Sequence, residues 1–558
     1  MTSVIVADVV VIGGGLAGHM AALEAARRGR EVALISKTQP FRTHSSIAGA
    51  GINLAVRAGD SWRDHAGDVW NDGHFLSDWD PVEVMTREGP ELVLSEFGDL
   101  LDRDGDGQVV SYQFGGTARG VRAGKNTGMQ LIRRCHGLLA DEGVRIYPYR
   151  MVTSLVTDGG ECLGVTALDL LTGEIEAFAA SSVILCGGGF GHAFQNTAHA
   201  SHMSGDAHAL AFRAGAALKD MEFVRFNETS LYAANCAITE SIGRKGAHLY
   251  NRDGERFLAR YDPRMEAVEP FYLKRYMQLE LEAGLGIDGK YFVADLTHLG
   301  EAYIQKEFPR SRRAVLLASG LDMVRDRLPI VPGVFTTLGG VATDVDGRTA
   351  VARLLAAGEC ACTGVHGADW RAGNTLLAAL VFGRRAGRSA ADTAASAANG
   401  RSRVAEVAGA ERERLAALAS RTGAEPIHVI TGELRRLMSW NVGVLRDRAK
   451  LETALEQMRA LRRRYEAARV WDTAMRLNEQ MNEFLELDSM LLVAEAVARC
   501  ALAREESRGT HWRRDFERRD DGRWMCHSLI ERDAGGQMTL RHLPVQLGEF
   551  RPTEVIIR

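Results

Sequence analysis

The sequence is 558 residues long and is poor in several features that would each indicate a particular class of protein. Charge is nearly balanced: 68 basic and 72 acidic residues give 68 − 72 = −4, which supplies no field for nucleic acid or anionic lipid. Proline is scarce at 12 residues, while the 59 glycines suit tight turns between regular elements. No apolar run approaches the roughly 20 residues that cross a bilayer. We therefore expect a folded protein of several domains that neither binds nucleic acid nor inserts directly into a membrane.

The cysteines lack the spacing of a metal or cluster site. Only Cys360 and Cys362 stand close together, and no second pair accompanies them at a spacing typical of zinc or ferredoxin ligands. We therefore expect no metal centre and no iron–sulfur cluster in this chain. The first residues also lack the basic region of a secretion signal, so we expect a cytoplasmic protein with reduced thiols.

The N-terminal residues follow the pattern of a dinucleotide-binding βαβ unit. Residues 8–12 are a short apolar run rich in β-branched side chains, and the glycines of Gly13-x-Gly15-x-x-Gly18 lead from it into a helical pattern. A second apolar run, residues 32–36, completes the unit. This arrangement predicts a pyrophosphate bound by backbone N–H groups at a helix N-terminus.

One expected ligand is missing from this unit. A standard NAD site has an acidic residue near the end of the second strand, where it binds the ribose, but Ser36 and Lys37 stand there. The departure argues against a standard NAD site. Glu359 follows a later apolar run and is a candidate ribose or flavin ligand, with a plain surface turn as the alternative.

The nucleotide-type pattern is interrupted and then returns. Mixed α/β sequence fills residues 1–238, an inserted cap is expected at 239–332, and strand and helix signals of the first type return at 333–398. In residues 399–504 apolar side chains recur at helical spacing, which predicts an all-helical domain, and residues 505–558 form a short C-terminal domain.

Ten short motifs occur along nearly the whole chain. They are residues 12–18, 42–52, 114–116, 125–128, 204–206, 218–224, 356–360, 365–368, 374–377 and 506–511. In these motifs the chain resembles the flavoprotein subunit of succinate dehydrogenase and fumarate reductase, with L-aspartate oxidase as a nearby relative. The resemblance implies FAD rather than NAD. It also implies an α/β fold with a Rossmann-like FAD-binding domain, an inserted α+β capping domain, a helical domain and a small C-terminal domain.

The resemblance implies a set of residues along the FAD. His44 stands where succinate dehydrogenase and fumarate reductase bond a histidine to the flavin 8α carbon, so we expect covalent FAD; an uncoupled histidine, as in L-aspartate oxidase, is the alternative. Asn374 and Thr375 begin a helix whose positive end would face the flavin C2 carbonyl. The expected cofactor-binding residues are Gly13, Gly15, Leu16, Ala17, Gly18, Ser36, Lys37, His44, Ser45, Ser46, Gly49, Gly51, Asp206, Glu359, Asn374, Thr375 and Leu376.

The substrate site departs from the family pattern. Asn227, two residues before Thr229, replaces the histidine of a His-Pro-Thr-Gly turn that binds one substrate carboxylate. Phe335 replaces a second substrate histidine, and Trp370 replaces an arginine that binds a carboxylate. An amide, a phenyl and an indole cannot compensate two buried negative charges, so tight succinate binding is not expected. We expect a reshaped, more apolar pocket that also includes His366; two ordinary core aromatics are the alternative.

The residue that moves the substrate proton is less well defined. In the family a capping-domain arginine does this, and the nearest cations in the matching stretch are Lys274 and Arg275. Thr239 and Glu240 of the family's proton pathway are retained, but the arginine that follows them there is shifted by one place to Arg244.

The arginine that follows Trp370 is shifted in the same way. Shifts of one residue that let Arg244 and Arg371 bind a carboxylate therefore remain an alternative.

These observations predict an FAD-dependent oxidoreductase that adds or removes two electrons at a C–C or C–N bond of a small molecule carrying at most one carboxylate. Two alternatives stay open: an ordinary dicarboxylate enzyme of the family, and an electron-transfer or binding subunit without substrate turnover. The region from residue 506 to Asp521 resembles the part of family members that lies near an iron–sulfur partner. The resemblance therefore implies an iron–sulfur or other electron-transfer partner, and packing within the chain is the alternative.

Overall fold

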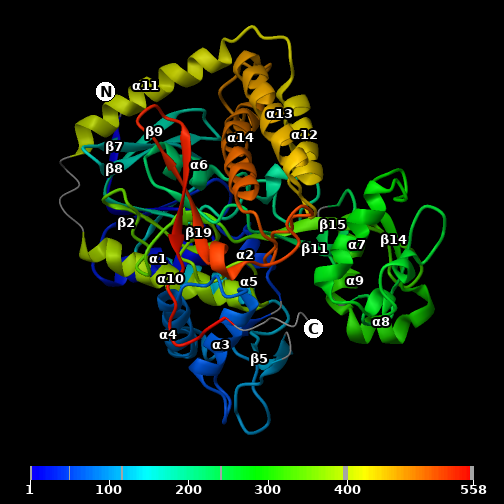
Figure 1. Ribbon diagram of the computed structural model, residues 1–558. Helices are drawn as coiled ribbons and strands as arrows, with labels where there is room; N and C mark the ends of the chain where they lie inside the picture. Colours follow the sequence, from blue (N-terminus) through cyan, green and yellow to red (C-terminus); the bar gives the residue numbers. More distant parts are fainter. Residues whose placement is uncertain are drawn as a thin grey trace.

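The computed structural model describes residues 3–49, 51–114, 117–234, 236–238, 242–393 and 400–552. Figure 1 shows a large body, a separate lobe formed by the middle of the chain, and a group of long helices from its last third. Among the described residues, no helix is both long and apolar enough to cross a membrane.

The body is built on a seven-stranded sheet in the order β6-β2-β1-β9-β8-β7, with β17 also paired to β9. Its strands are β1 (Val4–Ile12), β2 (Val32–Ser36), β6 (Arg145–Pro148), β7 (Arg150–Asp158), β8 (Glu161–Asp169), β9 (Ile175–Leu185) and β17 (Leu354–Ala356). β1 pairs in parallel with β2 and β9, as expected of a buried sheet made from apolar β-branched runs. The parallel pairing of β17 with β9 brings the later part of the chain into the same sheet.

The helices of the body pack on this sheet or on one another. They are α1 (Leu16–Arg27), α2 (His44–Ile47), α3 (Trp62–Asp72), α4 (Trp79–Phe97), α5 (Thr127–Asp141), α6 (Asp206–Arg213) and α10 (Asn374–Asp392). The backbones of α10 and α1 are in direct contact at two glycines of α10. A Cβ at Gly383 would lie 2.6 Å from the Ala17 carbonyl oxygen, and one at Gly387 would lie 2.3 Å from the Ala21 carbonyl oxygen. Two segments far apart in sequence thereby pack against each other.

The capping lobe is attached to the body through two long strands of its own sheet. Its sheet has the order β12-β11-β15-β14-β13, and the long β11 and β15 pair antiparallel with each other. The strands are β11 (Val224–Leu231), β12 (Cys236–Ala237), β13 (His248–Tyr250), β14 (Phe292–Asp295) and β15 (Leu328–Thr337), with α7 (Pro270–Glu282), α8 (Glu301–Glu307) and α9 (Pro309–Ser319) beside them. β15 extends across the expected cap limit at residue 332, and β11, which ends before residue 239, pairs with it, so the lobe is attached by a paired ribbon. The exact domain boundaries stay a prediction.

The last third of the chain contains α11 (Arg401–Ala419), α12 (Ile427–Asn441), α13 (Arg448–Ala467) and α14 (Glu479–Ala503), then α15 (Asp521–Trp524), β19 (Cys526–Arg532) and β20 (Met538–Pro544). β19 pairs with β10 (Leu218–Lys219), which joins β16 (Gly340–Ala342) and β18 (Ala361–Cys362) in a second five-stranded sheet. A three-stranded sheet of β3 (Ile52–Asn53), β4 (Tyr112–Phe114) and β5 (Thr117–Val121) lies apart from it. The C-terminal hairpin is therefore an extension of a body sheet.

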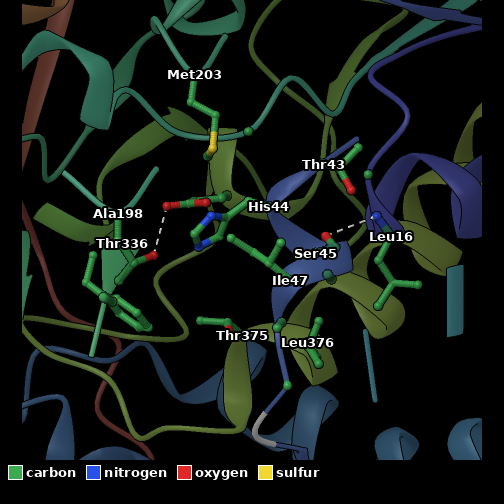
Figure 2. Close-up of a pocket in the computed structure, with 18 of the residues that line it drawn as sticks. Leu16, Thr43, His44, Ser45, Ile47, Ala198, Met203, Thr336, Thr375 and Leu376 are labelled. Atoms are coloured by element: carbon green, nitrogen blue, oxygen red, sulfur yellow. Dashed lines mark hydrogen bonds between the residues drawn. The ribbon is translucent and has the colours of Figure 1, made fainter. Parts of the chain in front are cut away.

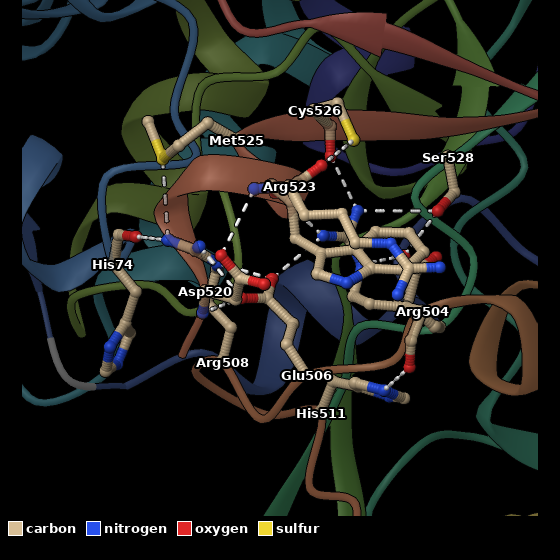
Figure 3. A network of polar contacts seen from close by, with 12 residues as sticks. His74, Arg504, Glu506, Arg508, His511, Asp520, Arg523, Met525, Cys526 and Ser528 are labelled. Carbon is tan, nitrogen blue, oxygen red and sulfur yellow. Dashed lines mark hydrogen bonds and ion pairs between the residues drawn. The ribbon is translucent and has the colours of Figure 1, made fainter. Parts of the chain in front are cut away.

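A buried polar network fixes the C-terminal segment to the body (Figure 3). Arg504 donates to Glu222 at 2.6 Å and to Glu506 at 3.0 Å, and all three side chains are fully buried. Arg508 donates to Glu506 at 2.7 Å and to Asp521 at 2.8 Å. Each buried charge has a partner of opposite sign, which is the condition under which such charges are tolerated.

Candidate active site

A cavity of about 1970 Å³ runs through the body from the glycine loop to the capping lobe. Its lining includes both ends of the expected FAD site, represented by Gly15 and Gly358, and cap residues such as Arg310. Figure 2 shows His44 near the centre of a space surrounded by Met203, Thr336 and Thr375. The discontinuous parts of the chain that were expected to share one cofactor therefore do face one cavity.

The glycine loop has the shape required for a close backbone approach. Gly13 has φ +116°, and a Cβ there would lie 2.1 Å from the Cys186 carbonyl oxygen. A Cβ at Gly18 would lie 1.9 Å from the Gly13 carbonyl oxygen, so Gly18 serves helix packing and does not itself line the cavity. The start of α1 is thus open toward the cavity, which fits a pyrophosphate on its first N–H groups.

Lys37, which stands near the position of the missing ribose acid, is surrounded by acids from elsewhere in the chain. The Lys37 ammonium donates to Asp206 and to Glu486, both at 2.6 Å, and to the Ser204 hydroxyl at 3.1 Å. Lys37, Ser36 and Asp206 line the cavity. Burial opposes ionisation of Lys37, but the two carboxylates raise its pKa above the ordinary value. Glu486, on α14, was not expected from the sequence, because 449 positions separate it from Lys37.

His44 begins the short helix α2 and lines the cavity. Its Nδ1 atom is buried without a hydrogen-bond partner among the described residues. Burial, together with the neighbouring His199, lowers the pKa of His44 to about 4, so the ring is neutral at pH 7. Ser45 also lines the cavity and accepts a hydrogen bond from the Leu16 N–H at 3.3 Å. Ser46 instead donates to the Thr43 carbonyl at 2.6 Å and lies outside the cavity lining.

A buried histidine that the sequence did not indicate connects His44 with Glu359. The rings of His44 and His199 are 4.7 Å apart at an angle of 65°, and His199 Nε2 lies 3.2 Å from Glu359 Oε1. Glu359 also accepts from Thr336 Oγ1 at 2.8 Å and from the Thr337 N–H at 3.0 Å. Burial opposes ionisation of Glu359, but His199 lowers its pKa below the usual range. Glu359 is therefore an ionised residue of the cavity wall and is not part of a plain surface turn.

The start of α10 meets the cavity through Gly373, Thr375 and Leu376. The side chain of Asn374 is turned away: its Oδ1 accepts from Asn53 Nδ2 at 3.1 Å and lies 3.0 Å from His65 Nε2. Asn374 therefore holds the helix start in place while the neighbouring backbone faces the cavity. This is the geometry in which a helix N-terminus favours negative charge.

The predicted substrate wall is present. Asn227, Phe335, His366 and Trp370 all line the cavity, whereas Thr229 does not. Asn227 is already occupied on its oxygen, which accepts from the Thr229 N–H at 2.7 Å and from the Thr229 hydroxyl at 3.2 Å. The rings of Phe335 and Trp370 stack with centroids 6.0 Å apart and planes 22° apart. The wall is thus mostly aromatic.

Arg371, the cation expected next to this wall, has acidic partners in the body. Arg371 donates to Asp72, to Asp68 at 3.1 Å and to Thr117 at 3.1 Å, and it does not line the cavity. Burial opposes its charge, but Asp72 raises the pKa of Arg371 above the ordinary value. The shift of one residue therefore places this guanidinium in an ion-pair network outside the cavity wall.

The three cap cations expected from the sequence also lie away from the cavity wall. The Arg275 guanidinium is stacked between the rings of Phe271 and Trp512, 3.5 Å and 3.2 Å from their centroids, and burial lowers its pKa to about 8. Lys274 is buried, with its pKa lowered by burial to about 8, and donates to the Phe226 carbonyl at 3.4 Å. Arg244 is exposed and does not line the cavity.

Two further residues of the predicted proton pathway, Thr239 and Glu240, lie outside the described residues. Their proposed roles stay predictions.

Cations that the sequence did not single out do line the cavity where the cap faces the body. They are Arg122, Lys125, Lys245, Lys306, Arg310 and Arg313. Arg310 donates to the carbonyl oxygens of Gly49 and of Lys125, the latter at 2.9 Å, while Lys245 pairs with Glu307 at 2.8 Å. The sequence did not indicate this group, because only Lys125 stands in one of the ten motifs and the other five lie outside them.

Comparisons with known proteins agree with this architecture. A model of the FAD binding domain matches residues 8–376, and a model of the fumarate reductase flavoprotein C-terminal region matches residues 431–555. The chain is 38% identical to a fumarate reductase flavoprotein subunit of Mycobacterium tuberculosis over 98% of each chain. It is 31% identical to a succinate dehydrogenase flavoprotein subunit of Rickettsia bellii, over 97% of this chain and 95% of that one. The solved structure of an E. coli quinol fumarate reductase chain superposes with a TM-score of 0.91 and 29% identity over 99% of each chain.

Proposed function

Because this chain belongs to the succinate dehydrogenase and fumarate reductase flavoprotein family, and is therefore an FAD-dependent oxidoreductase, we propose that its substrate carries at most one carboxylate. Two electrons would pass between FAD and a C–C or C–N bond of that substrate. The proposal concerns the substrate, since the cofactor and the class of reaction follow from the family.

The aromatic wall carries this proposal. Asn227, Phe335 and Trp370 line the cavity at the positions where the family pattern has two histidines and an arginine. Each charge-assisted hydrogen bond to a carboxylate contributes about 1.5–3 kcal/mol, and each ~1.4 kcal/mol is a factor of ten in binding. Arg371, the nearest replacement in the sequence, is committed to Asp68 and Asp72. A dicarboxylate would therefore lose several of its binding interactions.

The relatives favour a second candidate, a dicarboxylate oxidoreductase. Those named above are fumarate reductase or succinate dehydrogenase flavoproteins, and they match this chain over nearly its whole length. The cap cations Lys245, Lys306, Arg310 and Arg313 also line the cavity and offer positive charge to an anion. The comparisons therefore support the dicarboxylate candidate, while the residues of the aromatic wall support a substrate with at most one carboxylate.

The proposal also covers how the flavin is attached and whether the protein has a partner subunit. We infer that FAD is held covalently through His44, with Gly13, Gly15, Ser45, Asp206 and Glu359 along it, since all of these line the cavity. The relatives are named as flavoprotein subunits, which supports a partner subunit that exchanges electrons with the flavin.

One experiment distinguishes the two candidate substrates. Under anaerobic conditions, bleaching of the oxidised flavin by succinate and reoxidation of the reduced flavin by fumarate are measured beside the M. tuberculosis relative prepared in the same way. We expect both rates to be at least ~100-fold lower in this protein, because about two of the lost bonds suffice for that factor. Rates equal to those of the relative would establish the dicarboxylate candidate.

A further inference from the structure

The cavity opens to solvent between the capping lobe and the body, at a place that we call the cap entrance. The exposed residues of the cavity lining are concentrated there, around Lys125 of the body and in residues 305–318 of the cap. Two apolar side chains stand among them, Ile47 at 62% and Leu317 at 77% exposure. A cavity of about 1970 Å³ exceeds the roughly 300–1,000 Å³ of a site for one small molecule, so a substrate beside the FAD can reach this entrance.

The cap entrance carries an excess of positive charge. Among the described residues that line it, the charged ones are the cations Arg122, Lys125, Lys245, Lys306, Arg310 and Arg313 and the carboxylates Asp102 and Glu307. Glu307 is paired with Lys245 at 2.8 Å. The side chains of Lys125, Lys306 and Arg313 form no ion pair within the described part of the chain. Several cations are therefore available to an anion.

The other charged residues of the cavity lining do not cancel this excess, because each has a partner of its own. The pairs are Lys37 with Asp206, Arg150 with Glu176, and Glu359 with His199. Arg312, which stands next to Arg313, is paired with Asp322 and Glu301 and does not line the cavity.

Arg310 has a donor edge that no acceptor in the described residues occupies. Its Nη1 atom donates to the carbonyl oxygens of Gly49 and Lys125, the latter at 2.9 Å, and this fixes the guanidinium group against the body. Its Nε and Nη2 atoms have no such partner. Partial burial and the neighbouring Arg122 lower the pKa of Arg310 below its ordinary value, and no carboxylate opposes them. The Nε and Nη2 edge can donate two parallel hydrogen bonds to one carboxylate or phosphate group.

We propose that Arg310, with Lys125 and Arg313 beside it, binds the single acidic group of the substrate at the cap entrance, while the apolar remainder extends past Ile47 and Leu317 into the cavity. A carboxylate and a phosphate monoester both fit this site, because each accepts two hydrogen bonds from one guanidinium group. The apolar remainder follows from the two exposed aliphatic side chains. This inference rests on the proposed function and narrows its substrate to an amphipathic acid.

Hexanoate, hexyl phosphate and hexanamide test the proposal as ligands of the FAD-loaded protein. They share an apolar chain and differ in the terminal group, and isothermal titration calorimetry measures their binding. We expect a Kd at least tenfold lower for one of the two acids than for the amide, and the tighter acid identifies the group as a carboxylate or a phosphate. A higher salt concentration should raise the Kd of that acid and leave the Kd of hexanamide unchanged.

Variants then test the residues. Arg310→Gln should raise the Kd of the tighter acid about five- to thirtyfold, and Arg310→Lys, which keeps the charge but loses the donor edge, should have an intermediate effect. Arg313→Gln breaks no ion pair and should raise that Kd about two- to fivefold, so it tests the site even if the Arg310 variants fold poorly. Lys290→Gln is the matched control, because Lys290 is an exposed cap residue outside the cavity lining, and it should change nothing.

The outcomes distinguish this inference from the function on which it rests. Equal binding of the acids and the amide, or a preference for an acid that Arg313→Gln and Arg310→Gln leave unchanged, would overturn the inference alone. Bleaching of the flavin by succinate at the rate of the M. tuberculosis relative would overturn the proposed function and, with it, the limit to one acidic group.

Discussion

At the scale of single residues, the proposed covalent attachment of FAD depends on His44. Its ring is neutral at pH 7, because burial lowers its pKa to about 4, and a neutral imidazole is the form that can bond to the flavin 8α carbon. We predict that acid precipitation of the protein leaves the yellow colour in the pellet. In His44→Ala the flavin should move to the supernatant, while the circular dichroism spectrum stays unchanged.

His202 provides a matched control for this prediction. It also lines the cavity, and burial also lowers its pKa to about 4. His202→Ala should therefore retain flavin in the pellet if attachment is specific to His44. A colourless pellet from the unmodified protein would show that the FAD is bound without a covalent link.

At the scale of elements, helix α14 supports the cofactor cavity indirectly, because its Glu486 pairs with Lys37. Its carboxylate holds the Lys37 ammonium beside Asp206, and Lys37 and Asp206 line the cavity. Loss of the Glu486 charge removes one ion pair and loosens the position of Asp206. We predict that Glu486→Gln, made in the His44→Ala protein so that FAD exchanges freely, raises the Kd of FAD about two- to tenfold, as expected for one net hydrogen bond of ~0.5–1.5 kcal/mol.

Glu483 is the control for this change. It stands on the same helix, three positions before Glu486, and is exposed. Fluorescence titration of FAD into Glu483→Gln should give the Kd of the parent protein. An equal Kd for the Glu486 variant would show that α14 contributes nothing to the cofactor site.

Strand β19 is joined to the body by a charged histidine. His527 Nδ1 lies 2.6 Å from Asp220 and Nε2 lies 3.0 Å from Asp78, with Lys219 pairing Asp78 at 3.4 Å. Burial opposes the charge of His527, but Asp220 raises its pKa from 6.5 to about 9. Protonated His527 therefore contributes its full stabilisation below about pH 6.5 and loses it as the pH rises through 9.

We predict that the free energy of unfolding falls between pH 6.5 and 9.5 by up to about 3 kcal/mol from this group, since one pKa unit corresponds to about 1.4 kcal/mol. Urea unfolding at several pH values measures it. His527→Asn should be less stable at pH 6.5 and should show a smaller fall. An unchanged slope in that variant would assign the alkaline loss to other groups.

At the scale of the whole molecule, the sequence predicted those features that depend on residues close together in the chain. The glycine loop of Gly13 and Gly15, the interrupted nucleotide fold and the α/β class follow from strand, turn and helix signals, and the comparisons confirm the fold class, the family and FAD. The aromatic wall was also predictable, because Phe335 and Trp370 replace charged residues within recognisable motifs.

Charge pairing over long separations was not predictable in this way. Arg371 is neutralised by Asp72, 299 positions away, and Lys37 by Glu486, 449 positions away. No periodicity or spacing records such contacts, because they are created only when separate segments pack. The same reason explains why Arg275, a candidate proton-transfer residue in the sequence, is found between two aromatic rings.

That stack links the capping lobe to the rest of the molecule. Arg275 and Phe271 belong to α7 of the cap, whereas Trp512 follows the helical domain. Glu282, at the end of the same helix, pairs with Lys450 at 2.6 Å and with Arg514. These contacts hold one side of the lobe against the helices, while Arg310 holds the other side near Gly49.

We predict that Trp512→Leu makes the cap open more often. A cation–π contact contributes about 0.5–2 kcal/mol, so amide hydrogen exchange in α7 should accelerate roughly two- to thirtyfold, with little change in α1. Trp471→Leu is the control, because Arg469 stacks on Trp471 at 3.4 Å within one short segment far from the cap in sequence. That variant should leave exchange in α7 unchanged. If exchange in α7 is the same in the two variants, the Arg275 stack does not hold the lobe, and the ion pairs of Glu282 must carry that role.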